Sequence, residues 1–195
     1  MGAINVAIIG VGNCASSLVQ GIHKYSDVAP DSDVPGLMHP TLGEYHVGDI
    51  NVVAAFDVDS EKVGLDLSKA IHAGQNNTVR FHDVSETGVT VDRGMTHDGL
   101  GEFLSKVIER APGQTSDIVS ILRDREVDVV INYLPVGSEQ ATKWYVEQVL
   151  AAGCAFVNCI PVFIGREDYW QKRFQDKGIP IVGDDIKSQV GATIV

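Results

Sequence analysis

Short runs of apolar residues alternate along this chain with segments of helical periodicity. A run of four to eight apolar or β-branched residues predicts a strand, and apolar residues recurring every three or four positions predict a helix. The predicted strands cover residues 5–9, 51–56, 88–92, 128–133, 155–160 and 179–182. The predicted helices cover residues 15–25, 61–71, 100–110, 116–125 and 166–176. This alternation predicts a parallel sheet with crossover helices.

Two further features complete the predicted organisation. One more helix begins after Ser138, whose side chain is expected to cap it, and ends at Gly153. Residues 26–50 interrupt the alternation with three prolines and four aspartates, and predict an inserted loop or lobe.

A glycine motif follows the first predicted strand directly. Gly10-x-Gly12-x-x-Ala15 lies between that strand and the first helix, which is the pattern of a dinucleotide-binding turn. Gly10 permits the tight turn, Gly12 lets the backbone approach a pyrophosphate, and the helix N-terminus offers free N–H groups. The alternative is a strand–helix turn without a ligand. The predicted cofactor contacts here are Gly10, Val11, Gly12, Asn13, Cys14 and Ala15.

The fold class that follows is α/β, a Rossmann-type doubly wound parallel sheet with an insertion at about 26–50. We treat residues 1–195 as one nucleotide-binding domain. Ligands of such sheets bind at the carboxyl ends of the strands. Five segments are predicted to meet at that rim: residues 10–15, 57–59, 133–138, 158–161 and 184–188.

Asp57 ends the second predicted strand, where a carboxylate accepts hydrogen bonds from the adenine ribose. Such a carboxylate would repel a 2′-phosphate, so NAD is favoured over NADP. A surface aspartate is the alternative. Tyr133, Leu134 and Pro135 are predicted to hold a cofactor ring against the sheet, although a plain turn fits this segment equally well. Asn158 and Ser188 are assigned to the cofactor site from their places at the rim.

Lys187 is the candidate catalytic residue. It opens a further turn, where a cation opposes the helix dipole, so a partner is expected: a substrate anion, Asp184 or Asp185. A lysine there can polarise a carbonyl, pair with a phosphate or move a proton. The alternative is a surface lysine paired with a neighbouring aspartate. The two aspartates are also candidates for holding a divalent or monovalent cation, a weak signal by themselves.

Composition narrows the function classes. The chain has 195 residues and a net charge of −11 without a Lys/Arg-rich run, so neither nucleic acid nor an anionic membrane is the expected partner. No apolar stretch approaches the ~20 residues that span a bilayer. Three cysteines give no disulfide or metal pattern, and we expect a cytoplasmic protein without a signal peptide. The six histidines have no metal-ligand spacing.

Eight segments together resemble the inositol-1-phosphate synthase (myo-inositol-phosphate synthase) family, in its shorter bacterial and archaeal form. They are residues 9–18 (IGVGNCASSL), 35–39 (PGLMH), 55–59 (AFDVD), 76–78 (NNT), 133–139 (YLPVGSE), 156–158 (FVN), 161–163 (PVF) and 183–188 (GDDIKS). The resemblance implies that glucose 6-phosphate becomes 1L-myo-inositol 1-phosphate, with NAD reduced and then regenerated. It implies that Lys187 lies near the reacting oxygens, with Asp184 and Asp185 orienting it or neighbouring a cation.

Members of this family are considerably longer, and the resemblance places this chain in their N-terminal part. The resemblance implies that the part not represented here forms the tetramer contacts and the substrate lid. We therefore expect self-association in the longer form, and exposed apolar surface with little synthase turnover from 195 residues alone. Two alternatives remain: a non-catalytic NAD-binding module, and an NAD-dependent dehydrogenase with net hydride transfer.

Overall fold

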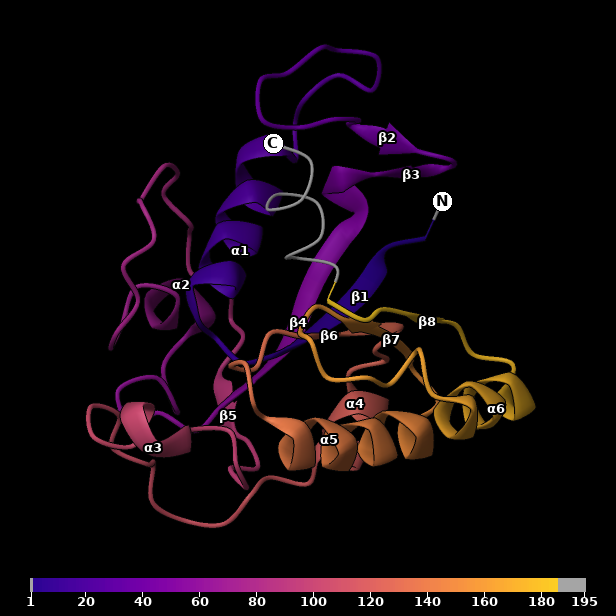
Figure 1. The fold of residues 1–195 in the computed structure, drawn as a ribbon. Helices are drawn as coiled ribbons and strands as arrows, with labels where there is room; N and C mark the ends of the chain where they lie inside the picture. The colour runs from indigo at the N-terminus through magenta and orange to yellow at the C-terminus, as the bar shows by residue number, and fades with distance from the viewer. Residues whose placement is uncertain (1, 186–195) are drawn as a thin grey trace.

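The computed structural model describes residues 2–185, and its centre is a six-stranded parallel sheet (Figure 1). The strand order is β5-β4-β1-β6-β7-β8, so the chain moves outward from β1 in one direction and then in the other. This order is that of a doubly wound dinucleotide-binding sheet. The strands are β1 (Ile4–Ile9), β4 (Ile50–Asp57), β5 (Val91–Arg93), β6 (Val129–Asn132), β7 (Ala155–Asn158) and β8 (Ile181–Val182).

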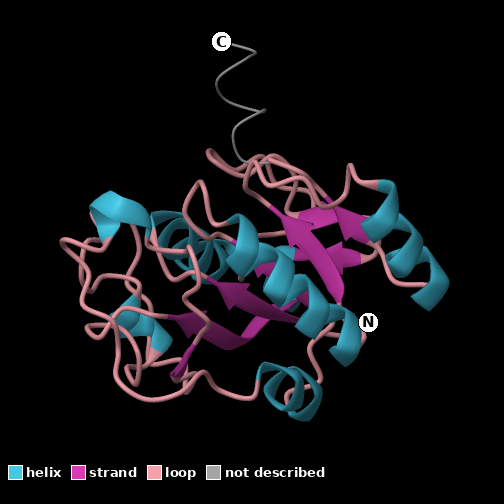
Figure 2. Ribbon diagram, turned by 60° about the horizontal axis from the view of Figure 1, so that its bottom comes forward, coloured by secondary structure: helices cyan, strands magenta, loops and turns pink. Residues whose placement is uncertain are grey.

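Helices cover both faces of the sheet (Figure 2). Ile8 packs with Val19 of α1 and Leu67 of α2 on one face. Its neighbours along β1, Ala7 and Ile9, point to the opposite face and pack in the cluster that contains α4, α5 and α6. The predicted doubly wound α/β fold is confirmed. The helices are α1 (Asn13–Tyr25), α2 (Leu67–Ala70), α3 (Gly101–Leu104), α4 (Ile118–Asp124), α5 (Glu139–Ala152) and α6 (Asp168–Lys177).

The predicted insertion at about 26–50 forms a small lobe beyond the end of α1 (Figure 1). It contains a two-stranded hairpin, β2 (Thr41–Leu42) with β3 (Tyr45–His46), and a 3₁₀ turn, η1 (Val47–Asp49). The His46 ring accepts the Gly48 amide while the Asp49 carboxylate accepts the His46 amide, which closes a capping box around this turn.

Two predicted helices are much shorter than the pattern indicates. Only α2 forms within 61–71. Gly64 has φ +88°, and the residues between Gly64 and α2 pair with the segment at β5: the Gly64 amide donates to Val91, and the Val91 amide donates to Leu65. Within 100–110 only α3 forms; turns follow it at residues 105–107, and Arg110 then forms a bridge with Asp59. Long-range backbone pairing overrides the helical pattern in both places.

The predicted cap of α5 is also wrong. Ser138 occupies the N-cap position, but its hydroxyl donates to the carbonyl of Pro135 at 2.6 Å. Asp98, from the loop before α3, accepts the amides of Gln140 and Ala141 at 2.8 and 2.9 Å instead. Gly153 ends the helix in the left-handed conformation, as predicted. No helix within residues 2–185 has the length and apolar character needed to span a membrane.

Candidate functional site

The glycine turn joins β1 to α1 at the carboxyl rim of the sheet. Gly10 has φ +88°, and a Cβ on it would lie 2.9 Å from the Tyr133 carbonyl oxygen, so only glycine fits. A Cβ on Gly12 would meet nothing within 4 Å among the described residues. The turn therefore leaves open space beside Gly12 and the first N–H groups of α1, where a pyrophosphate would fit.

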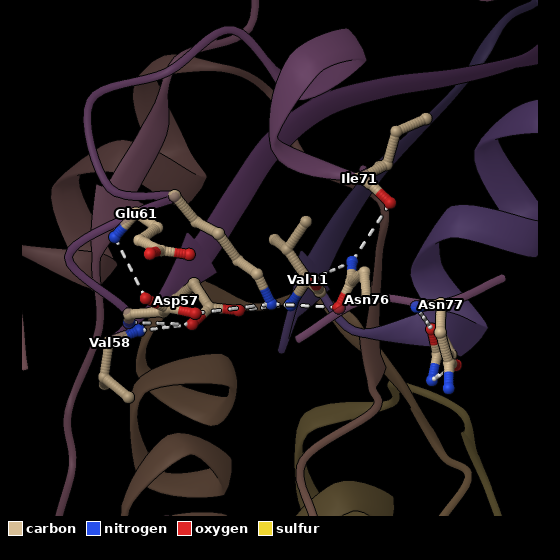
Figure 3. A network of polar contacts seen from close by, with 10 residues as sticks. Val11, Asp57, Val58, Glu61, Ile71, Asn76 and Asn77 are labelled. Atoms are coloured by element: carbon tan, nitrogen blue, oxygen red, sulfur yellow. Dashed lines mark hydrogen bonds and ion pairs between the residues drawn. The ribbon is translucent and has the colours of Figure 1, made fainter. Parts of the chain in front are cut away.

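Asp57 connects the end of β4 to this turn (Figure 3). One carboxylate oxygen accepts the Val11 amide at 2.7 Å, and the other accepts the amides of Val58 and Asp59 at 2.7 and 3.0 Å. These bonds fix the carboxylate in place at the rim. A carboxylate has about four lone-pair sites, so Asp57 keeps acceptor capacity for a ribose hydroxyl.

Asn13 binds the loop of residues 76–78. Its side-chain oxygen accepts the amides of Asn77 and Thr78 at 2.8 and 3.1 Å, and its amide donates to the Asn77 side chain at 2.9 Å. The loop is thereby held against the N-terminus of α1.

Asn76, in the same loop, contacts the glycine turn from another side (Figure 3). Its amide nitrogen donates to the carbonyls of Val11 and Ile71, both at 3.0 Å. Its oxygen accepts from the ammonium of Lys62 at 3.0 Å. Lys62 in turn forms an ion pair with Asp59 at 3.8 Å, and both side chains are buried. Nothing in the sequence pattern pointed to Lys62, which lay in a predicted helix.

These groups surround a cavity of about 290 Å³. Gly10, Gly12 and Asp57 lie on its polar side together with Lys62 and Asn76. Tyr145 of α5 closes part of it, and its hydroxyl accepts the Met95 amide at 2.9 Å. The apolar wall consists of Phe56, Met95, Leu100, Leu104 and Ile108.

A second cavity of about 220 Å³ adjoins the first one. The two share Gly12 and Asn13 from the turn and Tyr133, Leu134 and Pro135 from the end of β6. Burial raises the pKa of the Tyr133 hydroxyl well above its ordinary value, so this ring remains neutral. The remaining lining residues of the second cavity are Cys14, Val136, Cys159, Ile160 and Pro161. A groove with two compartments thus runs across the point where the strand order reverses, which suits an elongated ligand with two ring systems.

Asn158 is the last residue of β7, at the rim, but it lines neither of the two cavities. It is fully buried, its amide donates to Val162 and Asp184 at 2.7 and 2.8 Å, and its oxygen accepts from Asn132 at 2.9 Å. Because these contacts use both amide hydrogens, Asn158 shapes the strand ends and does not reach the cavities.

Asp184 has a similar role in the described structure. Its carboxylate accepts the amides of Ile164, Gly165 and Arg166 in addition to Asn158. One buried oxygen of Asp185 has no hydrogen-bond partner among the described residues. No three His, Cys, Asp or Glu side chains within residues 2–185 form a group that could hold a metal ion. The predicted residues Lys187 and Ser188 lie outside the described residues.

The structure brings eight of the predicted residues to the two cavities: Gly10, Gly12, Asn13, Cys14, Asp57, Tyr133, Leu134 and Pro135. Val11 is linked to them through its amide, which donates to Asp57. Ala15 is buried in the core cluster with Ile8 and lines neither cavity. The sequence pattern assigned no site role to Lys62, to Asn76 or to the apolar wall, most of which comes from irregular loops apart from Phe56 of β4 and Leu104 of α3.

Comparison with known proteins gives a consistent result. No protein-family model matches the chain. Inositol-3-phosphate synthase of Mycolicibacterium smegmatis is 56% identical over 193 residues, which are 99% of this chain and 53% of that protein. The enzyme of the same name from Corynebacterium glutamicum is 56% identical over 191 residues, 98% of this chain and 53% of its own length. The chain spans about half the length of the curated relatives it matches.

Solved structures share the fold. The crystal structure of Ari2 is 33% identical with a TM-score of 0.78, covering 94% of this chain and 54% of that one. A myo-inositol-1-phosphate synthase-related protein from Thermotoga maritima, 22% identical with a TM-score of 0.67, covers 94% of this chain and 55% of its own. The resemblance stated from the sequence is thereby confirmed: along nearly its whole length, this chain is related to about half of an inositol-3-phosphate synthase.

Proposed function

We propose that this chain is the NAD-binding part of an inositol-3-phosphate synthase. The observation that carries the proposal is the groove itself, in which the glycine turn, the Asp57 carboxylate and the segment 133–135 line adjoining cavities. The open space beside Gly12 fits a pyrophosphate, and the apolar wall near Asp57 fits an adenine.

Each part of the groove has a distinct task in this proposal. The N-terminus of α1 binds the pyrophosphate through its backbone N–H groups, and Asp57 accepts from the adenosine ribose. Tyr133, Leu134 and Pro135 flank the smaller cavity and hold the nicotinamide end. NAD, when bound, supplies reversible hydride transfer. The carboxylate of Asp57 disfavours a 2′-phosphate, so NAD is preferred over NADP.

The similarity to inositol-3-phosphate synthases also suggests the reaction of the whole protein. We assign it the conversion of glucose 6-phosphate to an inositol phosphate, with oxidation, enolisation, intramolecular aldol closure and reduction. Lys187 stabilises the developing negative oxygen. Asp184 and Asp185 orient Lys187 or neighbour a cation, and Asp184 also holds the adjacent segment 164–166. Self-association as a tetramer, a cation near Asp185 and a cytoplasmic location belong to the same proposal.

Titration calorimetry with NAD and NADP tests the cofactor assignment. We expect NAD to bind in the micromolar range and NADP to bind more weakly. Asp57→Asn should weaken NAD binding by about tenfold or more, because a charge-assisted acceptor is lost. Asp83→Asn is the matched control, since Asp83 is an exposed surface partner of Arg80. A folded protein that binds neither nucleotide contradicts the assignment.

Turnover assays separate the three functions. With NAD and glucose 6-phosphate, a synthase forms inositol phosphate and accumulates no NADH. Accumulation of NADH would indicate a dehydrogenase with net hydride transfer. NAD binding without either product would identify this chain as a non-catalytic cofactor module.

A further inference from the structure

The ammonium of Lys62 is buried beside the proposed cofactor groove. Its side chain is 5% exposed and lines the larger cavity. Burying a lysine is costly unless the charge is paired and hydrogen-bonded. The charge is paired with Asp59 at 3.8 Å, and the ammonium donates its one hydrogen bond among the described residues to Asn76 at 3.0 Å. Because burying this charge is costly and it lies beside the proposed cofactor site, Lys62 is expected to have a role there.

Lys62 fixes the orientation of the Asn76 amide. The two ends of an asparagine amide differ only in donor and acceptor character. Here the oxygen faces an ammonium and the nitrogen faces the carbonyls of Val11 and Ile71, so only one orientation satisfies all the contacts. The positive charge on the oxygen side also polarises the amide and strengthens its donation to Val11.

Asn76 and Asp57 hold Val11 from its two ends. Asp57 accepts from the Val11 amide at 2.7 Å, and Asn76 donates to the Val11 carbonyl at 3.0 Å. The Val11 carbonyl and the Gly12 N–H belong to one planar trans peptide, in which they point in opposite directions. Holding the carbonyl therefore sets the direction of the Gly12 N–H, which borders the open space proposed for the pyrophosphate.

The loop backbone is packed tightly over the ion pair. Gly74 has φ +61°, and a Cβ on it would lie 2.5 Å from the Asp59 carboxylate and 3.3 Å from the Lys62 side chain. The loop from Gly74 to Asn76 thus keeps the ion pair covered and brings the amide to the glycine turn.

We propose that Lys62 and Asn76 form a positioning pair that orients the Gly12 N–H toward the cofactor pyrophosphate. This rests on the proposed NAD site, but the positioning itself is a property of the free chain. Neither residue needs to contact the reacting atoms. The pair acts through the Val11 peptide, from the side opposite Asp57.

Asn76→Asp is the decisive variant, because it keeps the acceptor for Lys62 and removes both amide donors without changing size. Local hydrogen exchange of residues 10–16 in the free chain and NAD titration are measured on the same samples. We expect exchange in this turn to speed up by about tenfold or more and NAD affinity to fall by a similar factor, since the partly buried hydrogen bonds from Asn76 to Val11 and Ile71 are lost. Asn51→Asp makes the same chemical change at an exposed position and should alter neither.

A second variant covers the case in which Asn76→Asp does not fold. Asp59→Asn combined with Lys62→Met removes both charges of the ion pair together, so neither charge is left buried alone. It should give the same faster exchange in residues 10–16 while exchange in β6 and β7 is unchanged. Lys69→Met is its control, since Lys69 is 66% exposed.

The outcomes distinguish the two proposals. A wild-type chain that does not bind NAD overturns the proposed function, while the exchange comparison still decides the positioning role. A wild-type chain that binds NAD, with variants of equal affinity and equal exchange, overturns the positioning pair. A lower melting temperature without a change in either local readout shows a merely structural role and also overturns it.

Discussion

The Tyr145 hydroxyl occupies the space that a side chain on Gly94 would need. This hydroxyl accepts the Met95 amide at 2.9 Å, while the Gly94 amide donates to the carbonyl of Asp57 at 2.8 Å. One glycine thereby lets a tyrosine from α5 meet the ends of β4 and β5. Burial raises the pKa of Tyr145 far above its ordinary value, so the hydroxyl keeps its proton.

Gly94→Ala should therefore destabilise the fold. The added methyl group overlaps a buried hydroxyl, and overpacking of this kind costs about 1–3 kcal/mol. Thermal unfolding measures the loss, and NAD titration should show weaker binding because Met95 lines the cavity. Combining the change with Tyr145→Phe should restore part of the stability, although Tyr145→Phe alone is destabilising. Strictly additive effects of the two changes would contradict the contact.

Asp66 should make stability depend on pH in the acidic range. Burial alone would raise the pKa of Asp66, but hydrogen bonds from Ser68 and Thr87 outweigh it and lower the pKa to about 2. Because the folded pKa lies below the unfolded value, this stabilisation is complete above about pH 4 and is lost as the pH falls toward 2. Denaturant unfolding between pH 5 and 2 measures it. Asp66→Asn should reduce stability at neutral pH and flatten this part of the profile.

Asp98 should stabilise α5 more than Ser138 does through capping. Its carboxylate accepts the amides of Gln140 and Ala141, and these bonds outweigh burial and lower the pKa of Asp98. Asp98→Ala should cost about 1–2 kcal/mol, a usual value for a lost cap. Circular dichroism melting of Asp98→Ala and Asp98→Asn checks this. Equal stability of Asp98→Ala and wild type would exclude the capping role.

Asp184→Asn should loosen the connection between β7 and α6. An amide offers one acceptor oxygen where the carboxylate accepts from Asn158, Ile164, Gly165 and Arg166. We expect a loss of about 1–3 kcal/mol and faster exchange of the amides at 164–166. Asp176→Asn, on the exposed surface of α6, should leave both unchanged. The same result for the two variants would show that Asp184 does not order this connection.

The sheet and half of the site could be predicted from local sequence alone. Buried parallel strands are short and apolar on both faces, so 5–9 and 128–133 were recognisable, and the order of elements placed their ends at one rim. Gly10 and Asp57 follow from this directly. The role of such residues can be predicted from their position directly after or at the end of a predicted strand.

The remaining site residues depend on contacts distant in sequence. Lys62 reaches Asn76 in a segment where the predicted helix does not form, since Gly64 has φ +88° and α2 starts only at Leu67, and where Gly74 packs on Asp59. Asp98 replaces Ser138 as the cap because a loop from elsewhere reaches α5. The hydrophobic periodicity of the sequence cannot indicate these contacts, since each of them depends on tertiary packing.

The central position of β1 in the sheet affects how the protein folds during its synthesis on the ribosome. Val6 pairs with Val129 of β6, and Ile9 pairs with Asn132. At about 5–20 residues per second, the synthesis of the intervening segment takes roughly 6–25 s. During that time the apolar strand that leads into the glycine turn has β4 as its only neighbour in the sheet. β1, the first part of the cofactor site to be synthesised, therefore gains its second neighbouring strand late. Until β6 is made, the unpaired edge of β1 is a site at which a chaperone could bind.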